Sequence, residues 1–374
     1  MNLSGTGKLF VRCVFTAAIF LALKLPVPAL TFNVTFDSSV TGLTNAAQVE
    51  TEFTNATQVF QSLYTNSSSV NITVYWGSAW PHGSIGLGAS YSTAYGAFPY
   101  STLTNAMRNS RTTVADSNSV ASLPANDPAV SAGAVWYIPR AEIKALGLAS
   151  SIGTTANDTS NDGDVGFANT TYTFDPTNRA VSGQSDFIAV AEHEISEVMG
   201  RITFLRNSSG IYVPYDLFRF TNSSARNFST NATGVYFSAD NGVTSLKIFN
   251  VITNGGDIQD WQSTNTADVY DAFLTVGQQA FLSSADLTAV DILGYDLNFH
   301  PPHLSGTRLT NGNFQLTFTN VSGLNFSILA STNIATAVTN WTVLGTPTET
   351  PAAGQYQFTD SVTNKTRFYR ARLN

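Results

Sequence analysis

The chain has 374 residues, of which 43% are hydrophobic and 11% charged, and its formal net charge is −7. This length and hydrophobic content are enough for more than one packed core, so we expect two domains. An acidic chain with so few cations also argues against nucleic acid as a partner, because binding to nucleic acid depends on clustered Lys and Arg.

The first 29 residues have the pattern of a secretory signal. Lys8 and Arg12 precede the apolar run 13–23, and residues 27–29 (Val-Pro-Ala) offer the small side chains at which a signal peptidase cleaves. The run is short of the roughly 20 residues that span a bilayer, so we expect a secreted or cell-surface bacterial protein without a stable membrane span; a permanent anchor is the alternative. Cleavage removes three basic residues and no acidic ones, which takes the charge from −7 to −10, and it also removes Cys13, the only cysteine. We therefore expect no disulfide in the exported chain.

The segment after the signal predicts a strand, a long helix and a second strand. Residues 32–36 and 70–76 alternate between apolar and polar side chains, as half-buried strands do. From Gly77 to about Ser131 the chain is rich in Gly, Ser, Tyr and Ala, with one helix expected near residues 100–111, and this stretch is either a lid or a plain surface insertion. The long helix is indicated by apolar residues at steps of four, three, four and three: Val49, Phe53, Ala56, Phe60 and Leu63.

Three aspartates lie close together before the next elements. A strand is expected at 134–138, and residues 162–167 (Asp-Gly-Asp-Val-Gly-Phe) indicate a turn that leads into another strand. Asp158, Asp162 and Asp164 can in principle bind calcium, because hard cations prefer carboxylate oxygens. Their spacing differs from that of an EF-hand loop, and aspartate is also an ordinary turn residue, so both interpretations stay open.

A second helix is expected from residue 187. Asp186 can cap its first turn and Gly200 suits a left-handed stop at its end. An apolar stripe at steps of four, four and three should face a core, and His193 and Glu197 lie off that stripe, where they should face a cleft. The stripe is Phe187, Ala191, Ile195 and Val198.

Residues 193–201 of this helix read His-Glu-Ile-Ser-Glu-Val-Met-Gly-Arg, and they carry the strongest chemical signal. In the zinc-hydrolase pattern His-Glu-x-x-His, two His bind the metal from one helix face and the Glu is the general base. Here His193 takes the first ligand position, Glu197 replaces the second His, and Glu194 is the expected base. Asp216, 19 residues after Glu197, is the candidate third ligand. Two carboxylates make a bound metal less electrophilic, so zinc is the expected ion but a different native metal is an alternative.

A structural explanation of the same residues is that Glu197 pairs with Arg201 four residues later and that His193 is a satisfied histidine beside them. Arg219 can likewise form an ordinary ion pair with Asp216. Under that explanation Arg201 and Arg219 support a polar network, whereas at a metal site they lie behind the ligands.

The rest of the chain divides near its prolines. A hairpin is expected at 234–249, a polar turn at 255–261 and a short helix at 284–293. The prolines of residues 299–303 (Phe-His-Pro-Pro-His) favour a linker, which we place at 299–304. Residues 305–374 then alternate in short stretches typical of a small all-β sandwich, for which attachment, spacing or glycan binding are the available roles.

Four motifs in this order resemble those of exported bacterial zinc metalloproteases of the metzincin type, over most of residues 31–298. In that family the helix reads H-E-x-x-H-x-x-G-x-x-H, so the resemblance implies that His193 is a ligand and Glu194 the base. Thr203 stands where the third His would be and cannot replace it, which leaves Asp216 as the expected third ligand. The C-terminal segment is similar to the sandwich domains of Verrucomicrobia-type exported proteins. The motifs are residues 162–167, 191–201, 215–220 and 285–295.

The sequence thus predicts an α+β protein with four parts. They are a signal peptide (1–29), a zincin/metzincin-like protease domain with a mixed sheet and an active-site helix (30–298), the linker (299–304) and the sandwich (305–374). The expected function is a monomeric, zinc-dependent endopeptidase that hydrolyses proteins or peptides. The alternative is a catalytically inactive surface protein that keeps the protease fold as a binding or adhesion module.

Overall fold

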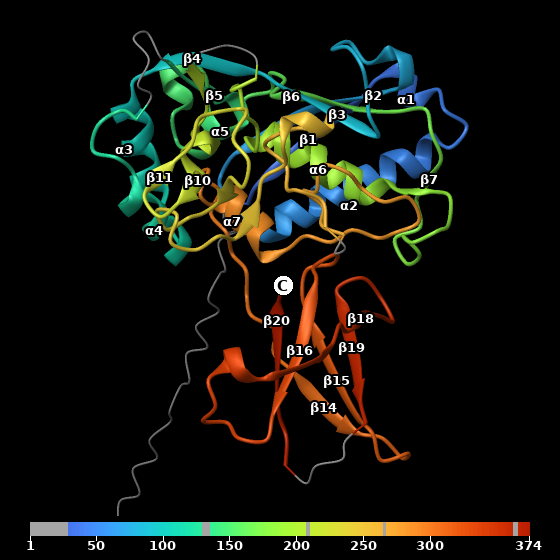
Figure 1. Cartoon of the computed structure of the whole chain (residues 1–374). Helices are drawn as coiled ribbons and strands as arrows, with labels where there is room; N and C mark the ends of the chain where they lie inside the picture. The colour runs from blue at the N-terminus through green and yellow to red at the C-terminus, as the bar shows by residue number, and fades with distance from the viewer. Residues whose placement is uncertain (1–28, 129–134, 207–209, 265–266, 362–365) are drawn as a thin grey trace, which may run out of the picture.

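A computed structural model describes residues 29–128, 135–206, 210–264, 267–361 and 366–374. The described part is α+β, and its central element is a four-stranded mixed sheet with the order β1-β2-β6-β3 (Figure 1). The three strands β1, β2 and β6 are parallel, and β3 pairs antiparallel with β6 at the edge. The strands are β1 (Thr31–Phe36), β2 (Ser69–Trp76), β3 (Gly88–Ser92) and β6 (Gly163–Phe167).

Two helices pack beside each other against this sheet (Figure 1). Helix α2 (Ala46–Leu63) buries the apolar face that the sequence predicts, from Val49 to Leu63. Helix α6 (Phe187–Met199) begins where a carboxylate oxygen of Asp186 accepts a hydrogen bond from the Ala189 amide, and it ends at Gly200, whose φ of 133° suits glycine. Both helices are therefore confirmed.

The stretch 77–128 contains more regular structure than its composition indicates. The helix expected near 100–111 is α3 (Tyr100–Ser110), but β3, β4 (Ala94–Phe98) and α4 (Val114–Ser122) were not predicted. The sequence of β3, Gly-Ala-Ser-Tyr-Ser, lacks an apolar alternation. This strand is the edge of the sheet and packs against α6, where small side chains allow a close approach. Strand β4 belongs to a second sheet with β5 (Val135–Pro139) and β9 (Ile211–Tyr212).

Short elements complete the part of the chain before the C-terminal sheets. The predicted hairpin at 234–249 is present as β12 paired with β13, and the short helix is α7 (Ser284–Asp291). The remaining elements are α1 (Ser38–Thr41), α5 (Arg140–Ala145), β7 (Tyr172–Thr173), β8 (Ser185–Asp186), the 3-10 helix η3 (Pro214–Phe218), β10 (Arg219–Asn222), β11 (Ala225–Arg226), β12 (Tyr236–Phe237) and β13 (Lys247–Ile248).

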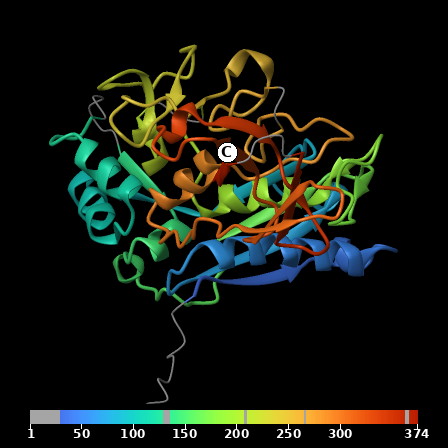
Figure 2. The same ribbon diagram turned by 90° about the horizontal axis from the view of Figure 1, so that it is seen from below.

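The C-terminal part forms two antiparallel sheets that face each other (Figures 1 and 2). Aromatic side chains join them: the rings of Phe318 on β15 and Phe326 on β16 lie 5.1 Å apart between centroids. The first sheet contains β14 (Ser305–Arg308), β15 (Phe314–Thr319), β19 (Gln355–Asp360) and β18 (Thr348–Glu349), and the second contains β17 (Thr342–Gly345), β16 (Phe326–Ser331) and β20 (Phe368–Leu373).

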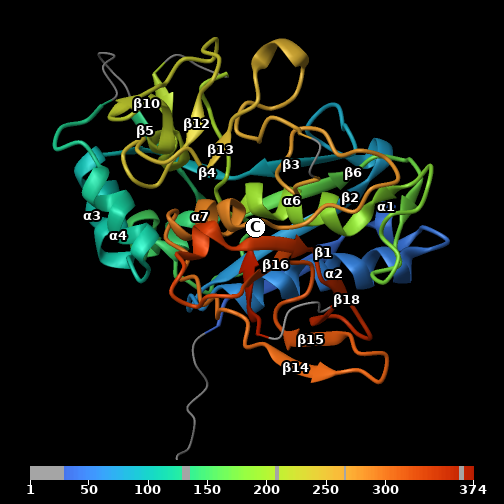
Figure 3. The ribbon, with the colours of Figure 1, turned by 60° about the horizontal axis from the view of Figure 1, so that its bottom comes forward.

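Backbone hydrogen bonds join these sheets to the preceding part of the chain. The amide of Ser284, the first residue of α7, donates to the carbonyl of Asn374 at 2.6 Å, and Leu282 forms an isolated bridge with Leu324 (Figure 3). Asn374, which follows β20, therefore contacts the start of α7.

No helix in the described ranges is long and apolar enough to cross a membrane. The predicted signal and the alternative of a membrane anchor fall outside those ranges, except for Ala29.

Candidate metal centre

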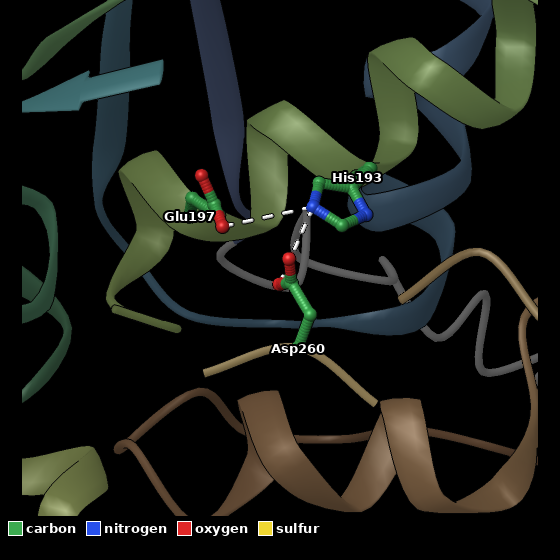
Figure 4. Close-up of side chains that lie close together, drawn as sticks. All are labelled: His193, Glu197 and Asp260. Atoms are coloured by element: carbon green, nitrogen blue, oxygen red, sulfur yellow. Dashed lines mark ion pairs between the residues drawn. The ribbon is translucent and has the colours of Figure 1, made fainter. Parts of the chain in front are cut away.

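Helix α6 brings His193 and Glu197 to the same face, one turn apart, and a loop from the other side of the site brings Asp260 between them (Figure 4). The Nε2 atom of His193 lies 3.6 Å from Glu197 Oε1 and 3.4 Å from Asp260 Oδ1. One ligand atom from each of these residues lies within 4.8 Å of the others, a group that can hold a metal ion.

A hydrogen bond to the backbone orients His193. Its Nδ1 lies 2.7 Å from the carbonyl oxygen of Val269, and because a carbonyl only accepts, Nδ1 carries the proton. The other ring nitrogen, Nε2, then faces the two carboxylates. Burial alone would lower the pKa of His193, but the nearby Asp260 carboxylate outweighs it, and the pKa lies well above its ordinary value.

Polar neighbours hold Glu197 in its ionised form. Ser90 Oγ on the edge strand β3 donates to Glu197 Oε2 at 2.6 Å, and Gln259 Nε2 donates to Oε1 at 3.0 Å. Burial alone would raise the pKa of this carboxyl, but His193, Arg201 and Ser90 bring the pKa down to about 2. Glu197 is therefore a carboxylate over the whole physiological pH range.

Arg201 completes the cluster. Its Nη1 lies 2.6 Å from Asp260 Oδ1 and its Nη2 lies 3.4 Å from Glu197 Oε1. The contact with Glu197 is the one that the structural explanation of the motif expects, and it coexists here with the convergence of three ligand atoms.

Glu194 lies next to this group and against the edge strand. A Cβ added to Gly88 of β3 would overlap Glu194 Oε1 and Val190, so glycine leaves the room that the carboxyl needs at this position. Burial, and then the negative charge of Glu197, raise the pKa of Glu194 well above its ordinary value. A raised pKa is what a carboxyl needs in order to take up and return a proton near neutral pH.

The structure does not bring Asp216 to the metal group. Its carboxylate accepts hydrogen bonds from Thr203 Oγ1 at 2.5 Å and from the Val213 amide at 3.0 Å, and the second of these caps the short helix η3. Burial raises the pKa of Asp216 to about 6. Arg219 also differs from the expectation, because it donates to the carbonyl of Ile258 at 2.7 Å and lies over the ring of Phe249. The acid that the structure places beside His193 and Glu197 is Asp260, not Asp216.

The sequence around Asp260 contains only a weak signal for this role. It lies in the stretch Gly-Gly-Asp-Ile-Gln-Asp-Trp at 255–261, which reads only as a polar turn and contains a second acid, Asp257. What positions Asp260 is the next residue, because Trp261 is fully buried and its Nε1 donates to Asp286 Oδ1 on α7 at 2.6 Å. A long-range contact of this kind cannot be read from the spacing of residues.

The acidic loop that suggested calcium is instead an ion-pair network. The buried Arg140 pairs with both Asp158 and Asp162, and the buried Lys144 pairs with Asp162. Protein cations thus neutralise these two carboxylates, and calcium is not needed to explain them.

The third aspartate of that loop, Asp164, contacts a histidine. His82 Nε2 lies 2.6 Å from Asp164 Oδ2, and the His82 ring stacks on Tyr91 with centroids 3.9 Å apart. Asp164 is thus paired within the protein as well.

The residues around His193 fit a divalent cation. Ligand atoms about 2.1 Å from a tetrahedral ion lie about 3.4 Å apart, and the two distances from His193 Nε2, 3.4 and 3.6 Å, are close to this value. A proton on Nδ1 held by a carbonyl is also the usual arrangement of a metal-binding histidine. One imidazole with two carboxylates favours a harder ion than a set of three imidazoles does.

Comparisons with known proteins add no assignment: no protein-family model, no curated protein and no solved structure matches this chain.

Proposed function

We propose that the protein is a secreted, metal-dependent endopeptidase of the metzincin-like type, with His193, Glu197 and Asp260 as metal ligands and Glu194 as general acid-base. The observation that carries the proposal is the approach of His193 Nε2 to two carboxylate oxygens beside a further carboxyl on the same helix. Bound zinc, or another divalent ion, would polarise a peptide carbonyl and lower the pKa of a water molecule.

The chain's own residues then supply the proton transfers. Glu194 directly follows His193 on the helix and is close enough for its pKa to respond to Glu197 and His193. It takes a proton from the attacking water. It passes that proton to the nitrogen of the departing amine. Ser90 and Gln259 hold Glu197 in place while the charge at the site changes.

The edge strand supports a peptide as the substrate. Among the described residues β3 pairs with β6 alone, so its other edge has backbone groups free for a further strand. Gly88 and Ser90 place this strand directly against Glu194 and Glu197. An extended peptide added to β3 would run past the metal group with its backbone held by hydrogen bonds.

The proposal is tested by the metal content of the purified mature chain, measured by mass spectrometry. We expect about one divalent ion per chain in the wild type and loss of that ion in His193→Ala and Asp260→Asn. Asp216→Asn is the matched control, since it changes a buried aspartate outside the group, and it should keep the metal. A wild type without metal under zinc-replete conditions would refute the proposal.

One observation favours a second candidate function. The 2.6 Å contact of Arg201 with Asp260 satisfies part of the cluster without any ion, as expected for a non-catalytic surface protein that keeps this fold as a binding module. A metal-free wild type would support this candidate.

A further inference from the structure

Arg201 contacts the same oxygen atoms that converge on His193. Its Nη1 lies 2.6 Å from Asp260 Oδ1, the oxygen that is 3.4 Å from His193 Nε2. Its Nη2 lies 3.4 Å from Glu197 Oε1, the oxygen that is 3.6 Å from the same nitrogen. A guanidinium and a divalent ion would therefore share both carboxylate oxygens.

The guanidinium is fixed in this position. Arg201 is fully buried, its Nε donates to Ser196 Oγ at 2.8 Å, and its Cζ lies 4.2 Å from the centre of the Tyr270 ring. A surface arginine could move into solvent when an ion arrives, whereas movement of this buried side chain would break these contacts. Arginine also keeps its charge at any physiological pH.

We propose that Arg201 is a built-in competitor of the metal: its charge holds Glu197 and Asp260 together when no ion is bound and lowers the affinity of the site for a divalent cation. This inference rests on the proposed metal site. It adds that the affinity is set below what the three ligands alone would give, so that the protein is folded both without and with the ion.

The charges around the site explain both effects. Without a cation, the two carboxylates would repel each other in a buried place, where such repulsion is poorly screened. Arg201 removes this repulsion. When an ion enters, the same positive charge opposes it over a few ångströms, again with little screening.

An opposite role for Arg201 makes a different prediction. If its planar fork serves mainly to orient the carboxylates for the metal, removing Arg201 will weaken metal binding. If Arg201 competes, its removal will strengthen metal binding while making the metal-free protein less stable. The sign of the change in affinity therefore separates the two roles.

The experiment is a calorimetric titration of Co²⁺ into the full mature chain, with the melting temperature recorded with and without the ion. We expect Arg201→Met to bind Co²⁺ at least about tenfold more tightly than the wild type, as loss of an unscreened repulsion requires. Its melting temperature should fall without the ion and rise more on adding it. Arg201→Lys, which keeps the charge, should bind Co²⁺ within about threefold of the wild type.

Arg206→Met is the matched control. Arg206 pairs with Asp257 at 3.2 Å with its side chain 35% exposed, so the same substitution there removes a positive charge that solvent screens. Its affinity for Co²⁺ should stay within about threefold of the wild type.

Each outcome is decisive. Equal or weaker binding by Arg201→Met, with a metal-binding wild type, overturns this inference and leaves the proposed function standing. No binding by the wild type or by either Arg201 variant overturns the proposed function itself. If Arg201→Met is insoluble when produced without metal, the inference requires that excess Co²⁺ during production restores soluble protein, and failure of that rescue counts against it.

Discussion

Replacing Glu142 by glutamine should make the protein more stable at neutral and alkaline pH. Glu142 on α5 is fully buried, and neither of its carboxyl oxygens has a hydrogen-bond partner among the residues that the structure describes. Its carboxyl lies under the end of α6, where a Cβ on Gly200 would be 2.9 Å from Glu142 Oε2. Burial raises the pKa of this carboxyl well above its ordinary value of 4.5.

The magnitude follows from proton linkage. Above pH 4.5 the unfolded chain releases the Glu142 proton while the native chain keeps it, so native stability falls as the pH rises toward the raised pKa. The loss is about 1.4 kcal/mol for each pH unit in that window. The amide of Glu142→Gln has no proton to release, so its stability advantage over the wild type should grow by the same amount per unit.

The assay is urea unfolding of both metal-free proteins at about pH 5, 6, 7 and 8, with the free energy of unfolding compared at each pH. Glu50→Gln, on the partly exposed face of α2, is the control and should show no such trend. A difference between Glu142→Gln and the wild type that does not change with pH would show that the native carboxyl is already ionised, and the reasoning from burial would then be wrong.

Three further changes test the site and its supports. Glu194→Gln should keep the metal and lower peptidase activity by about 10² to 10⁴, measured by cleavage of an unstructured protein substrate beside metal analysis; full activity would remove Glu194 from the mechanism. Gly88→Ala should cost about 1–3 kcal/mol and also reduce activity, because its Cβ would meet Glu194 and Val190, whereas Gly86→Ala should do neither; unfolding midpoints and cleavage rates report both. Trp261→Phe should lower the free energy of unfolding by about 1–3 kcal/mol, because it leaves the Asp286 carboxyl without its indole donor. It should also weaken Co²⁺ binding if Trp261 positions Asp260. Unchanged affinity would show that Asp260 is held independently of Trp261.

The sequence predicts the long helices well because they depend on features close together in the chain, namely the spacing of apolar residues and the capping residues at the helix ends. In α2 the apolar residues at helical spacing are all buried, and in α6 a capping aspartate and a terminal glycine mark both ends. Strand β3 could not be predicted in this way. It has few apolar residues, and it exists because β6 offers it a partner and α6 requires small side chains beside it.

The candidate site likewise has a part that local sequence predicts and a part that depends on long-range contacts. His193, Glu194 and Glu197 are close in the sequence, so helical geometry alone brings them together. The third acid comes from a different segment, and distance along the chain gave the wrong residue. Asp216 accepts the amide hydrogen bond that caps the start of η3. Asp260 reaches the site because Trp261 is anchored to α7.

The anchoring of Trp261 also connects the site to the C-terminal sheets. Asp286, which holds the indole, lies in the first turn of α7, and the first amide of that helix donates to the carbonyl of Asn374. A second connection reaches α6, because Gly323 lies close to Glu192, the residue before His193. Both segments that carry ligand residues are therefore in contact, through one or two residues, with the C-terminal part. Through these contacts the C-terminal sheets adjoin both segments that bring the candidate metal group together.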